Sequence, residues 1–193
     1  MRQSLRPAVV PVFLVLCLTF GGASAAGHFA NAFLQLLALV VIAWALIERR
    51  STPVPRAGRQ LLGFAVAILA LTVFQLIPLP PAIWTNLPGR EEIVAGFRDL
   101  GMALPWLPIS VTPYLTVASV LWLLPALAVL LATVRLGAFR PAWIAWTLMA
   151  VVAAGIAIGA LQRAGSDTAY FYEITNYGVA TGFFSNANHF GTL

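Results

Sequence analysis

The chain has very few charged residues and a single cysteine. Of its 193 residues only 9% are charged, whereas 61% are hydrophobic, and the mean hydropathy is +0.91. Soluble domains carry roughly a quarter charged residues, so this composition excludes a soluble protein and indicates an integral membrane protein. Cys17 has no partner cysteine, which excludes an intrachain disulfide and a cysteine metal site. We expect one transmembrane domain over residues 1–193, because several spans leave no room for a soluble domain of about 100 residues.

Lysine is absent, and the eleven basic residues are all arginines that lie in small groups between apolar runs. The net charge of +5 is therefore spread along the chain. It forms no basic face of the kind that binds nucleic acid. Phosphate-binding loops, dinucleotide-binding glycine motifs and the nucleophile elbow of hydrolases are also missing from the sequence.

Five apolar runs are long enough to cross the roughly 30 Å hydrocarbon core of a bilayer as helices. A sixth is expected to begin near Val179. The fold class predicted is an all-α, polytopic helical membrane protein with five complete transmembrane helices and the start of a sixth. The five runs cover residues 8–26, 29–47, 61–77, 114–134 and 142–161.

The distribution of arginine predicts the orientation of these spans. Basic residues in short loops are retained in the cytoplasm. Arginines 2, 6, 49, 50, 56, 59, 135 and 140 fall on one side, and arginines 90, 98 and 163 on the other. This bias predicts a cytoplasmic N-terminus. The first span has an alternative interpretation as a cleaved signal peptide, because Ala23, Ser24 and Ala25 resemble a cleavage site.

The loop over residues 78–113 contains a regular pattern of apolar and charged residues, which a simple connection between two spans does not require. Between Arg90 and Leu104 apolar residues recur at helical spacing, with charged residues on the opposite side. We expect a periplasmic loop whose amphipathic helix lies on the outer membrane surface. The alternative is a helix that packs over the bundle and has no ligand role.

A compact polar cluster closes the sequence. Asn186, Asn188 and His189 are costly in hydrocarbon unless they face a protein interior or a wet cavity, so they are functional candidates. Arg163 is the basic residue of the outer tail. Its guanidinium can form bidentate hydrogen bonds with a phosphate, or it can anchor the chain at the membrane interface. These four residues are the predicted substrate-binding set, and no catalytic residue is assigned. No metal or other cofactor is expected, because no second histidine or cysteine lies near His189.

Gly155 and Gly159 stand four residues apart in an apolar run. This spacing lets two backbones approach closely within a membrane. Packing within the chain is the favoured interpretation, and dimerisation is the alternative.

Three stretches carry a resemblance to a known family. They are QLIPLPPAIW at residues 75–84, WLPISVTPYLT at 106–116 and, most specifically, YGVATGFFSNANHFGTL at 177–193. Together they resemble the amino-terminal half of O-antigen ligase and O-antigen polymerase related proteins. The resemblance implies the amino-terminal part of a metal-independent glycosyltransferase of the bacterial inner membrane, which we expect to be inactive by itself. It implies undecaprenyl-pyrophosphate-linked glycan as donor, and lipid A-core or a growing glycan as acceptor, at the periplasmic face.

The same resemblance limits the role of His189. The histidine thought to act as base in this family lies in a later periplasmic loop, whereas His189 matches the histidine of the glycine, asparagine and histidine motif. Ala187 stands where the family often carries a basic residue. A lining or helix-shaping role is therefore expected for the cluster. Two other classes remain open, namely a fragment of a polysaccharide or lipid transporter and a noncatalytic membrane assembly subunit.

Overall fold

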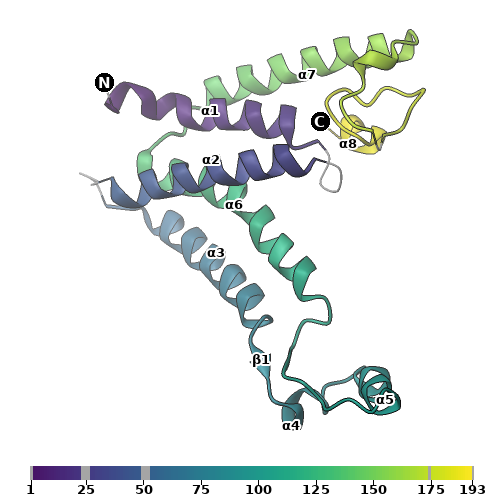
Figure 1. Cartoon of the computed structure of the whole chain (residues 1–193). Helices are drawn as coiled ribbons and strands as arrows, with labels where there is room; N and C mark the ends of the chain where they lie inside the picture. The colour runs from purple at the N-terminus through teal and green to yellow at the C-terminus, as the bar shows by residue number, and fades with distance from the viewer. Residues whose placement is uncertain (1, 23–26, 49–52, 174, 193) are drawn as a thin grey trace. The chain divides into compact units, whose positions relative to one another are not determined.

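The computed structural model of the chain describes residues 2–22, 27–48, 53–173 and 175–192, and helices dominate it (Figure 1). Two compact units can be distinguished. One combines Met1–Gly58 with Leu124–Leu193, and the other is Arg59–Leu123. Four of the described helices are long and apolar enough to cross a membrane. They are α2 (His28–Ile47), α3 (Arg56–Phe74), α6 (Pro113–Leu136) and α7 (Pro141–Arg163).

The first and the last of the predicted spans coincide only in part with the described helices. α1 (Arg2–Phe20) covers residues 8–20 of the span predicted over 8–26, and its apolar segment within the described residues is Leu5–Phe20, shorter than the roughly 20 residues needed for crossing. The alternative cleavage site at residues 23–26 lies outside the described residues, as do Arg49 and Arg50. The helix expected near Val179 begins only at Ala187. The intervening residues form turns that are hydrogen-bonded to α7.

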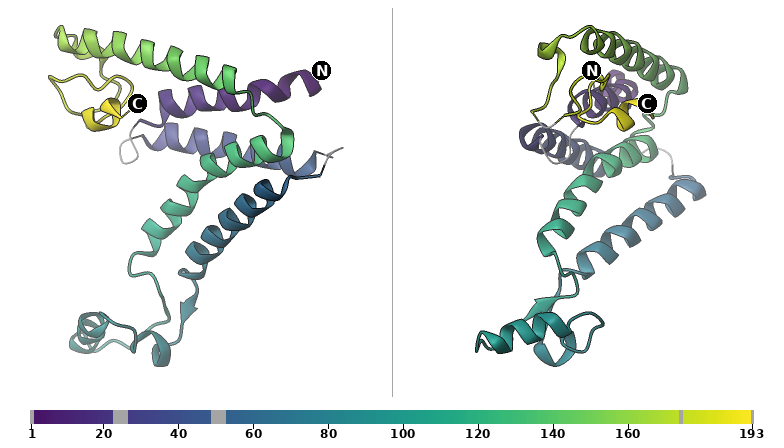
Figure 2. Two further views of the ribbon diagram at one scale, coloured as in Figure 1. Left: turned by 180° about the vertical axis from the view of Figure 1, so that it is seen from behind. Right: turned by 90° about the vertical axis from the view of Figure 1, so that its right-hand side faces the viewer.

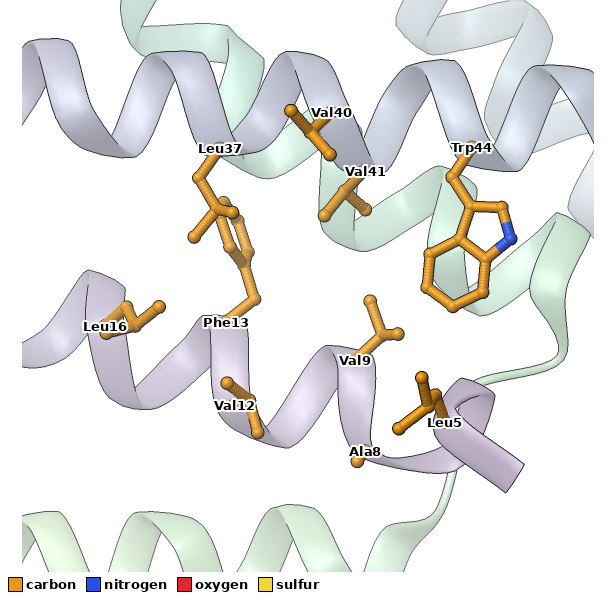
Figure 3. A pocket seen from close by; sticks show the side chains of 10 residues that line it. All are labelled: Leu5, Ala8, Val9, Val12, Phe13, Leu16, Leu37, Val40, Val41 and Trp44. Carbon is orange, nitrogen blue, oxygen red and sulfur yellow. The ribbon is translucent and has the colours of Figure 1, made fainter. Parts of the chain in front are cut away.

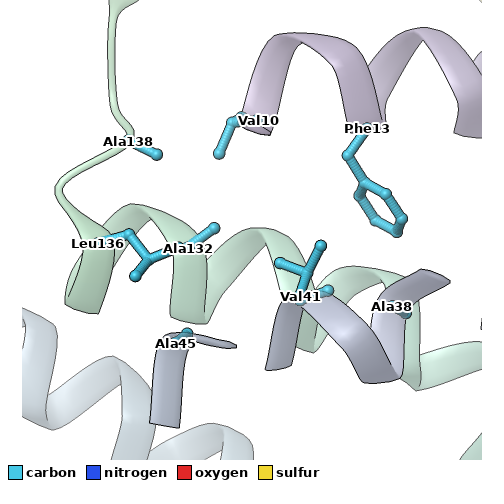
Figure 4. Packing of buried hydrophobic residues seen from close by; sticks show 9 residues of the cluster. Val10, Phe13, Ala38, Val41, Ala45, Ala132, Leu136 and Ala138 are labelled. Atoms are coloured by element: carbon cyan, nitrogen blue, oxygen red, sulfur yellow. The ribbon is translucent and has the colours of Figure 1, made fainter. Parts of the chain in front are cut away.

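The core of the first unit lies where α1, α2 and α6 meet, and α7 packs along α1 (Figures 1 and 4). Most of its buried residues are small. Alanines at spacings of four and seven let helix axes approach closely, as is common in membrane bundles. The cluster consists of Val10 and Phe13 of α1, Ala38, Val41 and Ala45 of α2, Ala128, Ala132 and Leu136 of α6, and Ala138.

Two arginines from other helices, Arg6 of α1 and Arg135 of α6, bind polar groups at the end of α2. The Arg6 guanidinium pairs with the Glu48 carboxylate at 2.5 Å, and the Trp44 indole N–H donates to the same carboxylate at 3.0 Å. Arg135 Nε donates to the Ala45 carbonyl at 2.6 Å. Two arginines that the sequence marked as topology signals therefore also satisfy polar groups where α2 ends.

The second unit contains a folded loop between α3 and α6. β1 (Pro78–Leu79) pairs antiparallel with β2 (Leu107–Pro108). The loop also carries two helices, α4 (Pro81–Trp84) and α5 (Glu91–Asp99). α5 is the predicted amphipathic helix, but it ends five residues before Leu104.

Two side chains hold this loop together. Trp84 is fully buried, and its indole N–H donates to the Pro105 carbonyl at 2.8 Å. Arg90 is 3% exposed and donates to the carbonyls of Pro108, at 2.9 Å, and Ile109. A buried guanidinium needs such partners, because burying an unpaired charge is costly. The segment following β2 is thereby tied to the start of α5.

Candidate functional site

The terminal tail, residues 164–173 and 175–192, folds back against the end of α7 (Figure 2). Gln162, in the last turn of α7, is only 2% exposed. Its Oε1 accepts from the backbone N–H groups of Thr181 at 2.7 Å and Gly182 at 2.9 Å. Its Nε2 donates to the carbonyls of Ala169 at 3.0 Å and Gly182 at 3.1 Å. One side chain therefore satisfies backbone groups from two separate parts of the tail.

The glycine pair of α7 receives an aromatic ring of the tail. A Cβ added to Gly155 or Gly159 would lie 3.2 or 3.1 Å from the ring of Phe190. Gly182 completes this packing site, because its φ of +57° suits glycine and an added Cβ would come within 2.7 Å of the same ring. The pair is thus used within the chain, as predicted, and it packs against the ring of Phe190, which belongs to the short helix α8 (Ala187–Gly191).

The tail also closes against the end of α1. The backbone N–H of Ser185 donates to the Gly22 carbonyl at 3.1 Å, and a Cβ added to Gly22 would clash with the Phe183 carbonyl at 2.2 Å. The Tyr172 hydroxyl donates to the Phe20 carbonyl at 3.4 Å. Burial raises the pKa of Tyr172 above its ordinary value, and a hydrogen bond donated by the Gly22 backbone N–H to the phenol oxygen opposes this rise.

The asparagine and histidine cluster forms the short helix α8 (Ala187–Gly191). Asn186 is its N-cap, and its Oδ1 accepts from the backbone N–H of Asn188 at 2.8 Å. This contact makes Asn186 a capping residue with a local structural role. The side chains of Asn188 and His189 are exposed, and the imidazole packs edge-on against Phe184, with 6.3 Å between ring centroids. The structure thus presents two of the three candidates at the surface.

Arg163 lies at a different part of the tail fold. It ends α7, is exposed, and donates to the Gly178 carbonyl. The neighbouring Tyr170 hydroxyl accepts from the Gly178 N–H at 3.0 Å and donates to the Val179 carbonyl at 3.0 Å. Phe190 of α8 contacts α7 at Gly159, which precedes Arg163 by four residues or about 6 Å of helix. The hydrogen bond of Arg163 thus runs to the middle of the tail, about one helical turn beyond the point where α8 contacts α7.

Sequence reasoning did not identify Gln162 or Phe190, the two residues that organise this site. A usable signal existed for Gln162, because an amide in the apolar run that forms α7 needs partners. Phe190 gave no signal, since nothing in the sequence indicates which ring fills a glycine pair. Across the residues that the structure describes, no three His, Cys, Asp or Glu side chains gather where they could hold a metal ion.

A separate apolar cavity of about 300 Å³ lies between α1 and α2 (Figure 3). Its walls offer aliphatic and aromatic surface, so it suits hydrocarbon and not polar chemistry. The polar candidates of the tail do not line it. The lining residues are Leu5, Ala8, Val9, Val12, Phe13, Leu16, Leu37, Val40, Val41 and Trp44.

Comparison of the chain with models of known protein families, with curated proteins and with solved structures gives no match. The terminal tail itself carries polar groups that bear on function. Its fold exposes a guanidinium at Arg163 and an amide and an imidazole at Asn188 and His189. Such groups suit an anionic ligand or one rich in hydroxyls.

Proposed function

We propose that the chain forms the amino-terminal membrane part of an O-antigen-ligase-like glycosyltransferase of the bacterial inner membrane. The whole protein would transfer or polymerise undecaprenyl-pyrophosphate-linked glycan. The supporting observation is that the motif at residues 177–192 is hydrogen-bonded to Gln162 through Thr181 and Gly182 and leaves Asn188 and His189 exposed. A noncatalytic assembly subunit would use these polar groups for helix packing, so their exposure favours the transferase.

The proposal includes the topology predicted from arginine placement. Five spans with a cytoplasmic N-terminus put the loop at 78–113 and the terminal tail on the periplasmic face. A sixth span would continue beyond α8. Lipid-linked glycan reaches this face with its pyrophosphate at headgroup level, which is also where an exposed arginine at the end of a span can meet a phosphate.

The chemistry of transfer suits this placement. The anomeric carbon of the donor sugar loses its bond to the pyrophosphate oxygen and gains a bond to an acceptor hydroxyl, whose proton passes to a base. Developing charge on the leaving pyrophosphate is stabilised by a guanidinium, and Arg163 has donors beyond the one used for Gly178. Asn188 and His189 would line the glycan path. The base would come from another part of the whole protein.

The test replaces Arg163 or His189 by alanine in the chromosomal gene and measures surface polysaccharide by gel laddering. Loss of one charge-assisted hydrogen bond is worth about 1.5–3 kcal/mol, so Arg163→Ala should reduce transfer roughly tenfold or more. Arg98→Ala is the matched control, because Arg98 is an exposed arginine outside the tail. It should leave the ladder unchanged.

The membrane face on which the lipid-linked glycan accumulates distinguishes a transferase from a transporter. When transfer fails, lipid-linked glycan accumulates on the periplasmic face, where added glycosidases or lectins reach it in spheroplasts. When transport fails, it accumulates on the cytoplasmic face. Normal ladders in both variants at normal protein levels would remove Arg163 and His189 from the site, and cytoplasmic accumulation would replace the transferase proposal by the transporter.

A further inference from the structure

The segment between α5 and β2 exposes large apolar side chains on a folded loop. Leu100 is 74% exposed, Met102 55% and Trp106 65%. We call these three residues the apolar tip. By contrast, Ile93 and Phe97, which belong to the apolar stripe of α5, are only partly exposed. The most accessible apolar surface of this loop therefore follows the helix and does not lie along it.

A C-terminal cap fixes the first part of the tip. The Met102 N–H donates to the Phe97 carbonyl and the Gly101 N–H to the Arg98 carbonyl, each at 2.9 Å. Gly101 has a φ of +65°, which completes the pattern of a Schellman cap. The backbone that carries Leu100 and Met102 is thus already ordered, so contact with a partner surface requires little further loss of conformational freedom.

The other end of the tip is anchored to the interior of the loop. Pro105 accepts the indole hydrogen bond of the fully buried Trp84, and Pro108 accepts from the buried Arg90. Trp106 lies between these two anchored prolines and still points most of its side chain outward. Two tryptophans of one small loop are therefore used in opposite ways, since Trp84 is an internal packing residue and Trp106 is a surface residue.

The loop is tethered close to two helices of membrane-spanning length. β1 starts four residues after the end of α3, and β2 ends five residues before α6 begins. Extended chain covers at most about 3.6 Å per residue, so these connections are short compared with the thickness of a bilayer. Lipid headgroups thus lie within reach of the loop. Indole rings concentrate at this level of a membrane.

We propose that the apolar tip is a membrane-docking surface that enters the headgroup and upper acyl region of the bilayer next to α3 and α6. The occupant is the lipid surface itself. The charges of α5 fit this arrangement, because Glu91, Glu92 and Arg98 are exposed and can stay in water while the tip is buried in lipid. This inference does not rest on the proposed transferase activity.

The test places one labelled cysteine at a chosen position. The native Cys17 is replaced by alanine, and a cysteine is introduced by Met102→Cys or by Glu92→Cys. Each single-cysteine protein is labelled with a nitroxide. The protein is reconstituted in phosphatidylglycerol and phosphatidylethanolamine vesicles. Power-saturation electron paramagnetic resonance then compares collision with oxygen, which partitions into lipid, and with a water-soluble nickel chelate. Position 102 should show a severalfold higher oxygen-to-nickel ratio than position 92.

Two outcomes would overturn the proposal. Equal ratios at 102 and 92 would place the tip in water. Shielding of 102 from both reagents would mean that protein covers it. A Met102→Cys variant that is misfolded is recognised independently, because rupture of the loop exposes Trp84 and shifts tryptophan emission to longer wavelength. Leu100→Cys, on the same cap, then repeats the measurement.

Discussion

Replacing Gln162 by methionine should release the terminal tail from α7. Methionine has a similar length but cannot accept the N–H groups of Thr181 and Gly182, which are both buried. Each buried donor left without an acceptor costs about 1–3 kcal/mol, so docking of the tail should weaken by about 2–6 kcal/mol. Even the lower figure, about 2 kcal/mol, raises the population of the open tail roughly thirtyfold.

Hydrogen exchange followed by mass spectrometry measures this opening directly. Peptides covering residues 175–186 should exchange at least an order of magnitude faster in Gln162→Met, while peptides from α2 should keep their rate. Gln60→Met is the control, because Gln60 is exposed on α3. Gln162→Glu keeps an acceptor for these N–H groups but replaces the Nε2 donor by a second oxygen, which would face the Ala169 and Gly182 carbonyls in a buried place, so the tail should again exchange faster than with glutamine. Unchanged exchange of the tail in Gln162→Met would refute the role assigned to this side chain.

Two further predictions concern the same tail. Gly182→Ala should make α8 more sensitive to limited proteolysis than Gly178→Ala does. Both glycines have positive φ, but only at Gly182 would a Cβ strike Phe190. Equal sensitivity of the two variants would argue against the ring contact, and Phe190→Ala should restore protease resistance to Gly182→Ala. Since the pKa of Tyr172 is raised in the fold, its contribution to tail docking is complete below the ordinary value of 10.0 and is lost as pH rises through the higher folded value. Tyr172→Phe should remove this alkaline loss of protection in hydrogen exchange, and an identical pH profile in both proteins would contradict the assignment.

The helices of the membrane part could be predicted from the sequence because their cause is local. Runs of apolar residues such as the one forming α7 must satisfy their backbone internally in hydrocarbon, and a helix does so within one segment. The predicted spans 29–47 and 142–161 accordingly lie within α2 and α7. The ends were harder, because helix termini depend on caps and turns. α5 stops at Asp99 since Gly101 reverses the chain.

The candidate site could be predicted only as a set of residue types. Polarity beside apolar helices pointed to Asn186, Asn188 and His189, but it did not distinguish the capping role of Asn186 from the exposure of the other two. That distinction depends on a hydrogen bond two residues along the chain. The hydrogen bond between Arg163 and the Gly178 carbonyl depends on the path of the whole tail, which local patterns do not specify.

Composition and hydropathy alone determined that this is a helical chain with several segments of membrane-spanning length, because the requirement to satisfy the backbone in an apolar solvent acts on each segment separately. Only the tertiary structure decided how the polar end of the chain is used. Gln162 meets Thr181 and Gly182 across nineteen and twenty residues, and Phe190 meets Gly155 across thirty-five. Such pairings depend on long-range packing and hydrogen-bond geometry, which no local pattern of residues encodes.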